Sequence, residues 1–404
     1  MLHLAIEVVL ALLTLCGIAF SLIALSAAHR FRGDGRQQPP VAALPPVSVL
    51  KPLHGADSES YAALRSHCLQ KYESYEIIFG VNDEDDQAVP LVRRLIAEFP
   101  DREVRLVISP QVFGSNRKVS NLVHMLREAK YQHILVNDGD IRVGPGYLRA
   151  VMSLFKAPTV GMVTCLYKGV PAKTIGSRLE SLGIATDFVP GVLTARVLDG
   201  RLRFGLGSTL AMRLGALQQI GGFESVVDYL ADDYQLGQRI AKAGFKVALA
   251  HEVVETAVPP YSIVEFWRHQ LRWARTMRVS RPGGYAGLVL TFAFPWALLL
   301  ATMAPDSAGA WMLLALALLG RIAVALYVGL GILDDRQLLR NLWLLPLRDL
   351  LALAIWVCSY GGNTVTWKGT KFQLKQGRIH PVSSANATLS AKLDPEVHSE
   401  AQRR

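Results

Sequence analysis

Long apolar runs lie near both ends of the chain, and the stretch between them mixes apolar and polar positions. From Val47 to Arg281 the composition is that of a soluble domain, whereas the flanking segments hold few charged residues. Of all residues 51% are hydrophobic and 19% are charged, and the mean hydropathy is +0.26. One soluble core needs less apolar material than this, so we expect part of the chain to face lipid.

The first apolar run, Leu4 to Ala28, is long enough for a helix that crosses a hydrocarbon core, which needs roughly 20 residues. No Lys or Arg precedes it, so we predict an uncleaved transmembrane anchor over residues 1–30 rather than a signal peptide. Three arginines between residues 30 and 36 follow directly, which places the next segment in the cytoplasm by the positive-inside rule. Residues 31–46 predict a stiff proline-rich linker.

Three further apolar segments follow the soluble stretch: Tyr285 to Ala304, Ala308 to Leu333 and Leu342 to Tyr360. The first two predict a membrane hairpin. The third contains Arg348 and Asp349, so it predicts either a spanning helix or a re-entrant one. We assign residues 285–366 to these C-terminal hydrophobic segments and residues 367–404 to a basic, partly disordered tail.

Between the apolar parts, short β-rich runs alternate with amphipathic helical stretches. This alternation predicts a largely parallel sheet covered by helices on both faces, an α/β domain over residues 47–260. Ligands bind such sheets at the carboxyl ends of the strands, so we expect the chemistry there. The predicted strands are Val47 to Leu50, Glu76 to Val81, Val104 to Ser109, His133 to Asn137 and Gly161 to Leu166. The predicted helices include Tyr61 to Lys71, Val89 to Phe99 and Lys118 to Lys130.

The net charge of +10 does not indicate a nucleic-acid partner, because no DNA- or RNA-binding motif is present and many basic residues flank apolar segments. Anionic lipid is the expected partner. The four cysteines show no C-x-x-C spacing and two lie in apolar segments, so neither a disulfide framework nor a zinc site is indicated. A reducing compartment fits this pattern.

Two aspartates follow the most apolar predicted strand. This strand ends at Asn137, and Asp138 and Asp140 come next, one residue apart. Because so apolar a strand is expected to be buried, its acids reach the carboxyl edge of the sheet. There they predict oxygen ligands for Mg²⁺ or Mn²⁺ and a diphosphate. An acid pair can also simply close a turn, and this alternative stays open.

A second acidic cluster, residues 82–86, also follows a predicted strand. We favour Asp83 as the ligand of a nucleotide base or ribose and interpret the other acids as helix caps or solvated groups. Residues 114–121 open a helix with small and basic side chains, which suits a phosphate at a helix N-terminus. Lys118 is a candidate donor contact there, and the alternative is a solvated surface lysine.

A third acidic pair, Asp232 and Asp233, stands at the start of a predicted helix. Direct transfer of a sugar to an alcohol, with inversion at the anomeric carbon, requires a carboxylate that removes the hydroxyl proton. Asp233 is the candidate for this base. The alternative is that Asp232 caps the helix and Asp233 interacts favourably with its dipole.

Residues 261–284 place aromatic and basic side chains at helical spacing, which predicts an amphipathic helix at a membrane surface. Most of the arginines there are expected to contact lipid. Arg272 is a candidate contact to a leaving diphosphate, since the guanidinium fork matches phosphate oxygens.

In their order along the chain, these clusters resemble the inverting family 2-like glycosyltransferases of GT-A fold and, within them, the ceramide glucosyltransferase group. Similar strings include K-P-L-x-G at residues 51–55, x-D-x-D-D at 82–86 and I-R-V at 141–143. His269 departs from the group, which has Gln or Arg at the start of its (Q/R)-x-x-R-W motif. The group's three aspartate sites and this motif are matched by Asp83, Asp138 with Asp140, Asp233, and Arg272-Trp273.

The resemblance implies transfer of a sugar from a UDP-sugar to the hydroxyl of a membrane lipid, with Asp233 as the base and a divalent metal on Asp138 and Asp140. The sequences near residues 114–122 and 229–236 are more similar to those of bacterial hopanoid-associated members than to those of animal ceramide enzymes. For these, the resemblance implies N-acetylglucosamine as the sugar, a hopanoid polyol such as bacteriohopanetetrol as the acceptor, and the bacterial inner membrane as the location. Glucose is the alternative sugar. Ceramide is the alternative acceptor. The implied donor-binding residues are Asp83, Lys118, Asp138, Arg272 and Trp273.

Two further functions stay open. A processive polysaccharide synthase shares the aspartates and the R-W end, although such enzymes usually need more membrane helices for a polymer channel. A catalytically silent membrane protein that binds a nucleotide or a lipid would use the same acids as caps. The apolar segments Leu182 to Leu193 and Gly205 to Thr209 are expected to line the acceptor side of a glycosyltransferase.

Overall fold

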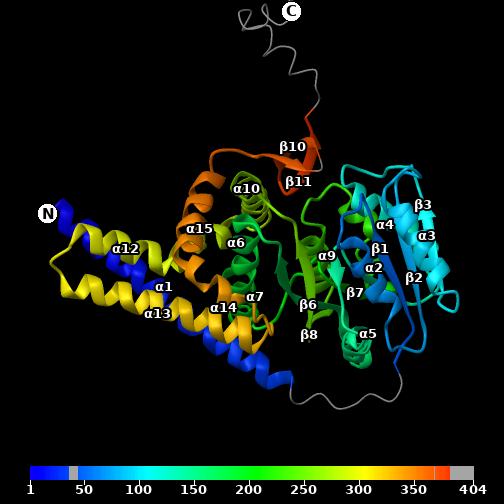
Figure 1. The fold of residues 1–404 in the computed structure, drawn as a ribbon, viewed down its shortest axis with the longest axis horizontal. Coiled ribbons are helices and arrows are strands. Elements are labelled where there is room, and N and C mark those ends of the chain that lie inside the picture. Colours follow the sequence, from blue (N-terminus) through cyan, green and yellow to red (C-terminus); the bar gives the residue numbers. More distant parts are fainter. Residues whose placement is uncertain (36–43, 368, 383–404) are drawn as a thin grey trace, which may run out of the picture.

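The computed structural model describes residues 1–35, 44–367 and 369–382. It contains an α/β domain, a group of long apolar helices and a small three-stranded sheet (Figure 1). Helices α6 (Ile175–Gly183), α7 (Val189–Leu198) and α10 (Ile263–Ser280) lie between the α/β domain and the long apolar helices. Most of the expected linker, residues 36–43, and the tail from residue 383 lie outside the described residues.

The α/β domain contains an eight-stranded sheet of order β3-β2-β1-β4-β7-β6-β8-β5. Strands β3, β2, β1 and β4 are parallel, and every residue of β1 and β2 is buried. Burial of both strand faces is typical of a sheet that is covered by helices on both sides. The strands are β1 (Val47–Pro52), β2 (Tyr75–Val81), β3 (Val104–Ile108), β4 (His133–Val136), β5 (Ile141–Arg142), β6 (Val160–Pro171), β7 (Leu210–Arg213) and β8 (Lys246–Val258).

The other half of the sheet is mixed, which corrects the expectation of a largely parallel sheet. Strand β7 runs antiparallel to both β4 and β6, and β5 runs antiparallel to β8. The loop before β7 contains Gly207, which lies beside Asp138 at the carboxyl edge of β4. Because β7 starts from that edge, it must run back against β4. No helical crossover signals this strand in the sequence.

Helices complete the α/β domain. Helix α4 (Arg117–Arg127) packs against β1 and β2, and α9 (Asp232–Lys242) packs against β6 and β8. The expected α/β domain of GT-A fold is confirmed, although its sheet is mixed. The other helices of the domain are α2 (Ser60–Cys68), α3 (Ala88–Glu98), α5 (Tyr147–Met152) and α8 (Leu214–Gln219).

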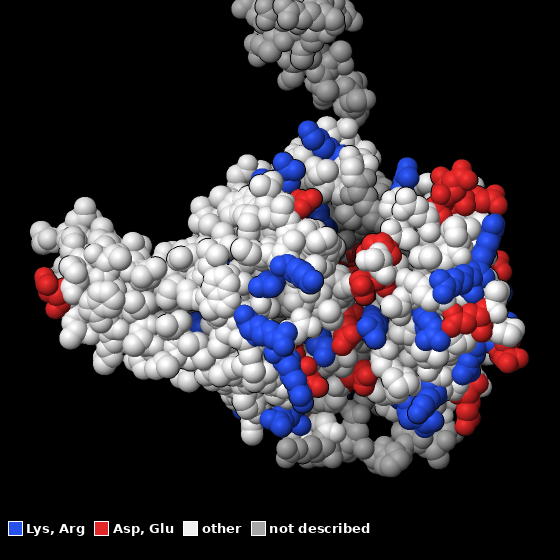
Figure 2. Space-filling model, viewed as in Figure 1, with Lys and Arg blue, Asp and Glu red and all other residues white. Residues whose placement is uncertain are grey.

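Apolar helices at both ends of the chain are confirmed. Helix α1 (Leu2–Asp34), α13 (Ala308–Gly331) and the segment Leu338–Ser359, which includes α15 (Leu345–Ser359), are long and apolar enough to cross a membrane. The remaining predicted segment is a bent pair, Pro282–Thr291 and α12 (Ala293–Met303), with 48° between its halves. Helices α1, α12 and α13 pack together, and Figure 2 shows very few charged side chains on this part of the surface.

A further helical segment, Ile175–Leu198, is also long and apolar enough to span a membrane, although most of its residues are buried inside the protein. It consists of α6 (Ile175–Gly183), a π-helical turn at Ile184–Phe188 and α7 (Val189–Leu198). Helix α6 packs on β6, and the turn packs on α13. The segment therefore joins the α/β domain to the apolar helices.

The small sheet follows the last apolar helix and consists of β9 (Thr364–Trp367), β10 (Thr370–Lys375) and β11 (Arg378–Pro381). The segment assigned to the tail, residues 367–404, thus begins with two strands. Alternating residues of these strands, including Phe372 and Leu374, form a small core that contacts Leu230 and Val279. Contacts with distant residues decide this structure, so local pattern did not predict it.

Candidate active site

The loop after β4 carries Asp138 and Asp140, and the buried Asn137 holds its start. The Asn137 side-chain amide donates to the Tyr147 hydroxyl at 2.9 Å and to the carbonyl of Ser208 at 2.6 Å. Nε2 of His67 lies 3.2 Å from the Asn137 amide oxygen. These bonds connect the end of β4 with the loop before β7. They fix the point at which the two aspartates leave the sheet.

Lys51 lies directly beneath this loop and was not predicted as a functional residue, although it opens the K-P-L-x-G string. Its Nζ is fully buried and donates to the carbonyl oxygen of Asp138 at 3.0 Å. Burial lowers the pKa of Lys51 to about 7, and the nearby carboxylates of Asp140 and Asp138 oppose this shift. Lys51 therefore supports the acidic loop from inside the sheet.

Lys118 connects two of the acidic clusters. Its Nζ lies 2.7 Å from Oδ1 of Asp138 and 3.1 Å from Oδ2 of Asp232. Burial alone would lower the pKa of Lys118, but the charges of Asp138 and Asp232 raise it above its usual value. The side chain is only 18% exposed, so the alternative of a solvated surface lysine does not describe it.

Asp232 pairs with Lys118 and does not cap α9, whose N-cap residue is Ala231 without a side-chain cap. The cap-only interpretation of this acidic pair is therefore wrong for Asp232. Its role was missed because the partner, Lys118, is distant in the sequence. Burial raises the pKa of Asp232, and the charge of Lys118 opposes that shift.

The carboxylates of Asp233 and Asp138 both lie next to Gly207 in the loop before β7. Oδ2 of Asp233 accepts a hydrogen bond from the backbone N–H of Gly207 at 2.9 Å. A Cβ on Gly207 would lie 3.1 Å from Oδ2 of Asp138 and 3.2 Å from Oδ2 of Asp233. The two carboxylates therefore flank one small space next to Gly207. Burial raises the pKa of Asp233 to about 6, and the charge of Asp232 contributes.

Glycines permit this convergence. A Cβ on Gly237 would lie only 2.1 Å from the backbone nitrogen of Gly205, so α9 touches the loop before β7 along its backbone. This close contact places the start of α9, with Asp233, over Gly207. Only residues without a Cβ allow such an approach.

Asp140 and Asp83 lie at the same edge of the sheet. Oδ2 of Asp140 accepts a hydrogen bond from the Thr256 hydroxyl at 2.5 Å. Burial raises the pKa of Asp140, and the charge of Asp138 raises it further. Asp83 is exposed at the carboxyl end of β2, two strands from β4, which corresponds to about 10 Å across a sheet. The neighbouring acid Asp86 accepts hydrogen bonds from the backbone N–H groups of Gly55 and Ala88, whereas the N-cap residue of α3 is Gln87 without a side-chain cap.

Arg272 and Trp273 lie on α10 (Ile263–Ser280), which begins with a capping box formed by Ser262 and Glu265. Burial lowers the pKa of Arg272, and the charges of Tyr261 and Glu180 oppose that shift. Arg272 is half-buried on this helix and directly precedes Trp273, whose ring lies 5.6 Å from that of His269.

The carboxylates fit a divalent cation that is shared with a diphosphate. Mg²⁺ commonly takes one or two protein carboxylates and completes its shell with water and substrate phosphates. Asp138 and Asp140 share one short loop, and a cation between them would relieve the repulsion that raises the pKa of Asp140. In the described part of the chain, no group of three or more His, Cys, Asp or Glu side chains could hold a metal. A closed structural metal site is therefore not indicated there.

Comparison with known proteins identifies the family. The model of "Glycosyl transferase family 21" matches residues 9–380. The chain belongs to glycosyl transferase family 21. Because this match runs from α1 through the small C-terminal sheet, the apolar helices belong to the family 21 architecture together with the α/β domain.

Relatives of this family 21 chain carry the name ceramide glucosyltransferase, which confirms the resemblance. Ceramide glucosyltransferase 1 of Caenorhabditis elegans is 27% identical over 60% of this chain and 52% of its own length. Ceramide glucosyltransferase 3 of the same organism is 27% identical over 64% of this chain and 56% of its own length. The chain thus spans about half the length of these two relatives. The ceramide glucosyltransferase of Pyricularia oryzae is 23% identical over 89% of this chain and 91% of its own length.

Among solved structures, the mannosyltransferase PcManGT from Pyrobaculum calidifontis, in complex with GDP-Man and Mn²⁺, overlaps 86% of this family 21 chain. The identity is 19% and the TM-score 0.48, with 99% of that chain covered. TarS of S. aureus, in complex with UDP-GlcNAc, overlaps 84% of the chain at 11% identity and a TM-score of 0.38, with 99% of that chain covered.

Proposed function

We propose that this family 21 chain transfers a sugar, with inversion, from a UDP-sugar to a hydroxyl group of a membrane lipid. The observation that carries the proposal is the convergence of Asp138 and Asp233 on the space beside Gly207. A donor site and a proton acceptor must lie within the length of one sugar for direct transfer. A protein whose acids were only caps or turn residues would not need this arrangement.

Asp233 is the proposed base. Its pKa of about 6 leaves the carboxylate ionised at neutral pH while keeping it basic enough to accept a proton. The proton of the lipid hydroxyl moves to Asp233 as the hydroxyl oxygen forms a bond to the anomeric carbon. The bond from that carbon to the diphosphate oxygen breaks on the opposite face, and UDP leaves with its bonding electrons.

Positive charge on this chain stabilises the departing diphosphate. Lys118 already lies against Asp138, and Arg272 on α10 is the second proposed cation. Fixed charges of this kind stabilise the developing negative charge without reorganisation during the reaction. Asp138 and Asp140 would hold a divalent metal, which would supply further positive charge at the diphosphate. Asp83, farther along the edge, suits the base or ribose of the nucleotide, and Trp273 stays a proposed donor contact.

The acceptor is a lipid with a primary hydroxyl at its polar end. The names of the relatives favour ceramide, whereas the hopanoid polyol implied by the sequence strings stays a prediction. Glucose is the sugar that those names favour, and N-acetylglucosamine stays the alternative. Basic side chains gather where the apolar helices meet the α/β domain (Figure 2), which supports a cytoplasmic α/β domain under the positive-inside rule.

Product analysis tests the proposal. The purified full chain in lipid nanodiscs is incubated with UDP-glucose or UDP-N-acetylglucosamine and with ceramide or bacteriohopanetetrol, and the products are identified by mass. We expect one added sugar on one of the lipids. A ladder of masses that rises by single sugars would indicate a polysaccharide synthase. Binding of UDP without any turnover would indicate a non-catalytic binding protein.

A further inference from the structure

Glu180 on α6 is a buried acid that the proposed reaction does not use. It is 5% exposed, and its Oε2 accepts a hydrogen bond from Nε2 of Gln270 at 2.8 Å. Nδ1 of His269 lies 3.4 Å from the same oxygen. In the part of the chain that the structure describes, both contacts of this carboxylate involve Oε2 and no hydrogen bond reaches Oε1. Glu180 therefore keeps one carboxylate oxygen that can accept a hydrogen bond from a ligand.

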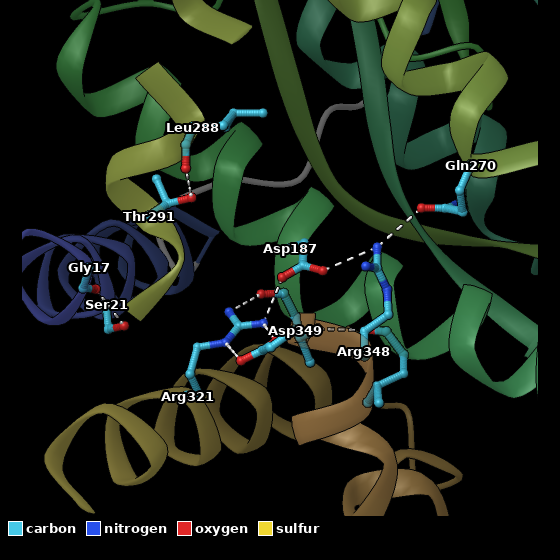
Figure 3. Close-up of polar contacts among 11 residues, drawn as sticks. Gly17, Ser21, Asp187, Gln270, Leu288, Thr291, Arg321, Arg348 and Asp349 are labelled. Atoms are coloured by element: carbon cyan, nitrogen blue, oxygen red, sulfur yellow. Dashed lines mark hydrogen bonds and ion pairs between the residues drawn. The ribbon is translucent and has the colours of Figure 1, made fainter. Parts of the chain in front are cut away.

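The orientation of Glu180 is fixed from the membrane side. Nη2 of Arg348 on α15 donates to Oε1 of Gln270 at 3.2 Å (Figure 3). The amide N–H donors of Gln270 are therefore free to face Glu180, and Nε2 donates to it. The same Arg348 nitrogen lies 3.2 Å from Oδ2 of Asp187 in the π-helical turn. Arg348 thus sets the orientation of the Gln270 amide group, and this amide group orients the carboxylate of Glu180.

A charge network anchors this arrangement between the apolar helices. Arg321 on α13 donates to both carboxylate oxygens of Asp349 on α15, at 2.8 and 2.6 Å, and to Asp187 at 2.6 Å (Figure 3). Ionised groups inside apolar segments are costly and are kept where a site requires them. Helix α6 is fixed from the other side, because the Ser181 hydroxyl donates to the carbonyl of Gly169 on β6 at 2.7 Å.

Aromatic rings form a continuous arc near Glu180. Successive ring centroids along this arc are 5.0, 6.3, 5.6 and 5.1 Å apart. Most of the rings are half-buried, and rings of this kind suit the boundary between a lipid headgroup and its chains. In order, the arc consists of Tyr167, Phe188, Trp273, His269 and Tyr261.

Strands β6 and β8 link the surroundings of Glu180 to the acidic loop after β4. Gly169, whose carbonyl accepts the hydrogen bond of Ser181, pairs with Thr256 on β8. The Thr256 hydroxyl in turn donates to Oδ2 of Asp140. Glu180, one residue before Ser181, is therefore carried by a helix that contacts the same pair of strands as Asp140, so a polar headgroup at the ring arc can approach both Glu180 and the acids of the active site.

We propose that Glu180 binds a second hydrogen-bond donor of the acceptor lipid, a hydroxyl or amide N–H next to the reacting hydroxyl. Glu180 then selects lipids that carry such a donor over simple long-chain alcohols. This inference rests on the proposed lipid glycosyltransferase function. The amide N–H and secondary hydroxyl of a ceramide and the neighbouring hydroxyls of a polyol share this chemistry.

Lipid binding tests this selection without requiring turnover. The full chain carrying Asp233→Asn is placed in nanodiscs, and binding of two lipid pairs is measured by native mass spectrometry. One pair is ceramide and its analogue methylated at the amide nitrogen and secondary hydroxyl. The other is bacteriohopanetetrol and its analogue methylated at every hydroxyl except the terminal one. We expect the free lipid of one pair to bind about tenfold more tightly, as the loss of one charge-assisted hydrogen bond predicts.

Adding Glu180→Gln is expected to reduce this ratio to about one, whereas Glu73→Gln, a change at an exposed acid, should leave it at about tenfold. Asp349→Asn serves as a second comparison, because it loosens the network without removing the Glu180 carboxylate. Equal binding of free and methylated lipids by the chain that retains Glu180 would overturn the inference. So would an equal loss of affinity for both members of a pair in Glu180→Gln, which indicates a structural role. Hydrolysis or transfer of UDP-sugar by the chain with Asp233 separately reports the proposed function.

Discussion

The Lys118 ammonium group lies 2.7 Å from one carboxylate oxygen of Asp138. This contact joins the N-terminal end of α4 to the loop after β4, and the second partner of Lys118, Asp232, adds the start of α9. Three elements that are far apart in the sequence therefore meet through one cation. The first prediction concerns this cation.

Replacing Lys118 by Met leaves the carboxylate of Asp232 buried without its cation. We expect the free energy of unfolding to fall by about 2 to 3 kcal/mol and the KM for the UDP-sugar to rise. Thermal unfolding of the detergent-solubilised chain measures the first effect. Lys130→Met, which removes an exposed pair with Glu103, should change stability by less than about 1 kcal/mol. Similar effects of the two substitutions would contradict a structural pairing at Lys118.

Replacing Asp233 by Asn removes the proposed base. We expect kcat to fall by about 10² to 10⁴ while UDP-sugar affinity stays nearly unchanged, because the base contacts the acceptor hydroxyl and not the nucleotide. Titration of UDP by calorimetry checks binding, and product mass checks transfer. Asp85→Asn, at an exposed acid, is the matched control. Equal loss of binding and transfer in Asp233→Asn would assign Asp233 a structural role.

The reaction should lose rate in mild acid. Burial raises the pKa of Asp233 to about 6, so its carboxylate becomes protonated as the pH falls through that value and can no longer accept the lipid proton. We expect kcat/KM for the acceptor to fall about tenfold for each pH unit below about 6. Initial rates from about pH 5 to 8 measure this fall of kcat/KM with pH. A rate that stays constant across the range would exclude Asp233 as the base.

A methyl group at residue 207 should disturb the active site without a large effect on folding. In Gly207→Ala the new Cβ would lie 3.1 Å from Asp138 and 3.2 Å from Asp233, so the carboxylates must move apart. Small displacements of reacting groups can reduce rates by about 10²-fold. Gly191→Ala is the control, since nothing lies within 4 Å of that position. Initial rates and thermal unfolding distinguish the two variants, and unchanged transfer by Gly207→Ala would contradict the proposed site.

Removal of divalent metal should weaken donor binding. Chelation by EDTA is expected to raise the KM for the UDP-sugar and abolish most of the transfer, and added Mg²⁺ or Mn²⁺ should restore both. Asp138→Asn should not be restored to the same extent, because it lacks one of the proposed ligands. Full activity after chelation would show that Lys118 and Arg272 supply the positive charge without a metal.

Local sequence pattern predicted the strands of the parallel half-sheet well. The predicted strand Val104 to Ser109 corresponds to β3 (Val104–Ile108), and the predicted helix Val89 to Phe99 corresponds to α3 (Ala88–Glu98). Apolar runs also predicted α1 and α13, because a membrane-length apolar segment is visible in composition alone. The position of Asp138 at a strand end followed from the same pattern, since a buried strand exposes its first polar residues at the edge.

Local pattern failed where contacts between distant residues decide the structure. Strand β7 is short, and only its approach from the carboxyl edge of β4 determines its direction. Residues 370–381 were assigned to a tail, because the partners of their apolar side chains are Leu230 and Val279. Glu180 was not singled out either, since nothing near it in the sequence indicates its contact with Gln270.

The sequence by itself determined which segments are apolar enough for a membrane, which alternate as strands and helices, and which acids end the strands. These properties depend on residues a few positions apart, so the periodicity of the chain reveals them. Three contacts were decided only by the tertiary structure. Asp233 and Asp138 face one space, and Lys118 joins Asp138 to Asp232. Arg348 orients Gln270 toward Glu180. Each of these contacts joins elements distant in sequence, and packing of the whole sheet and its helices sets their distances.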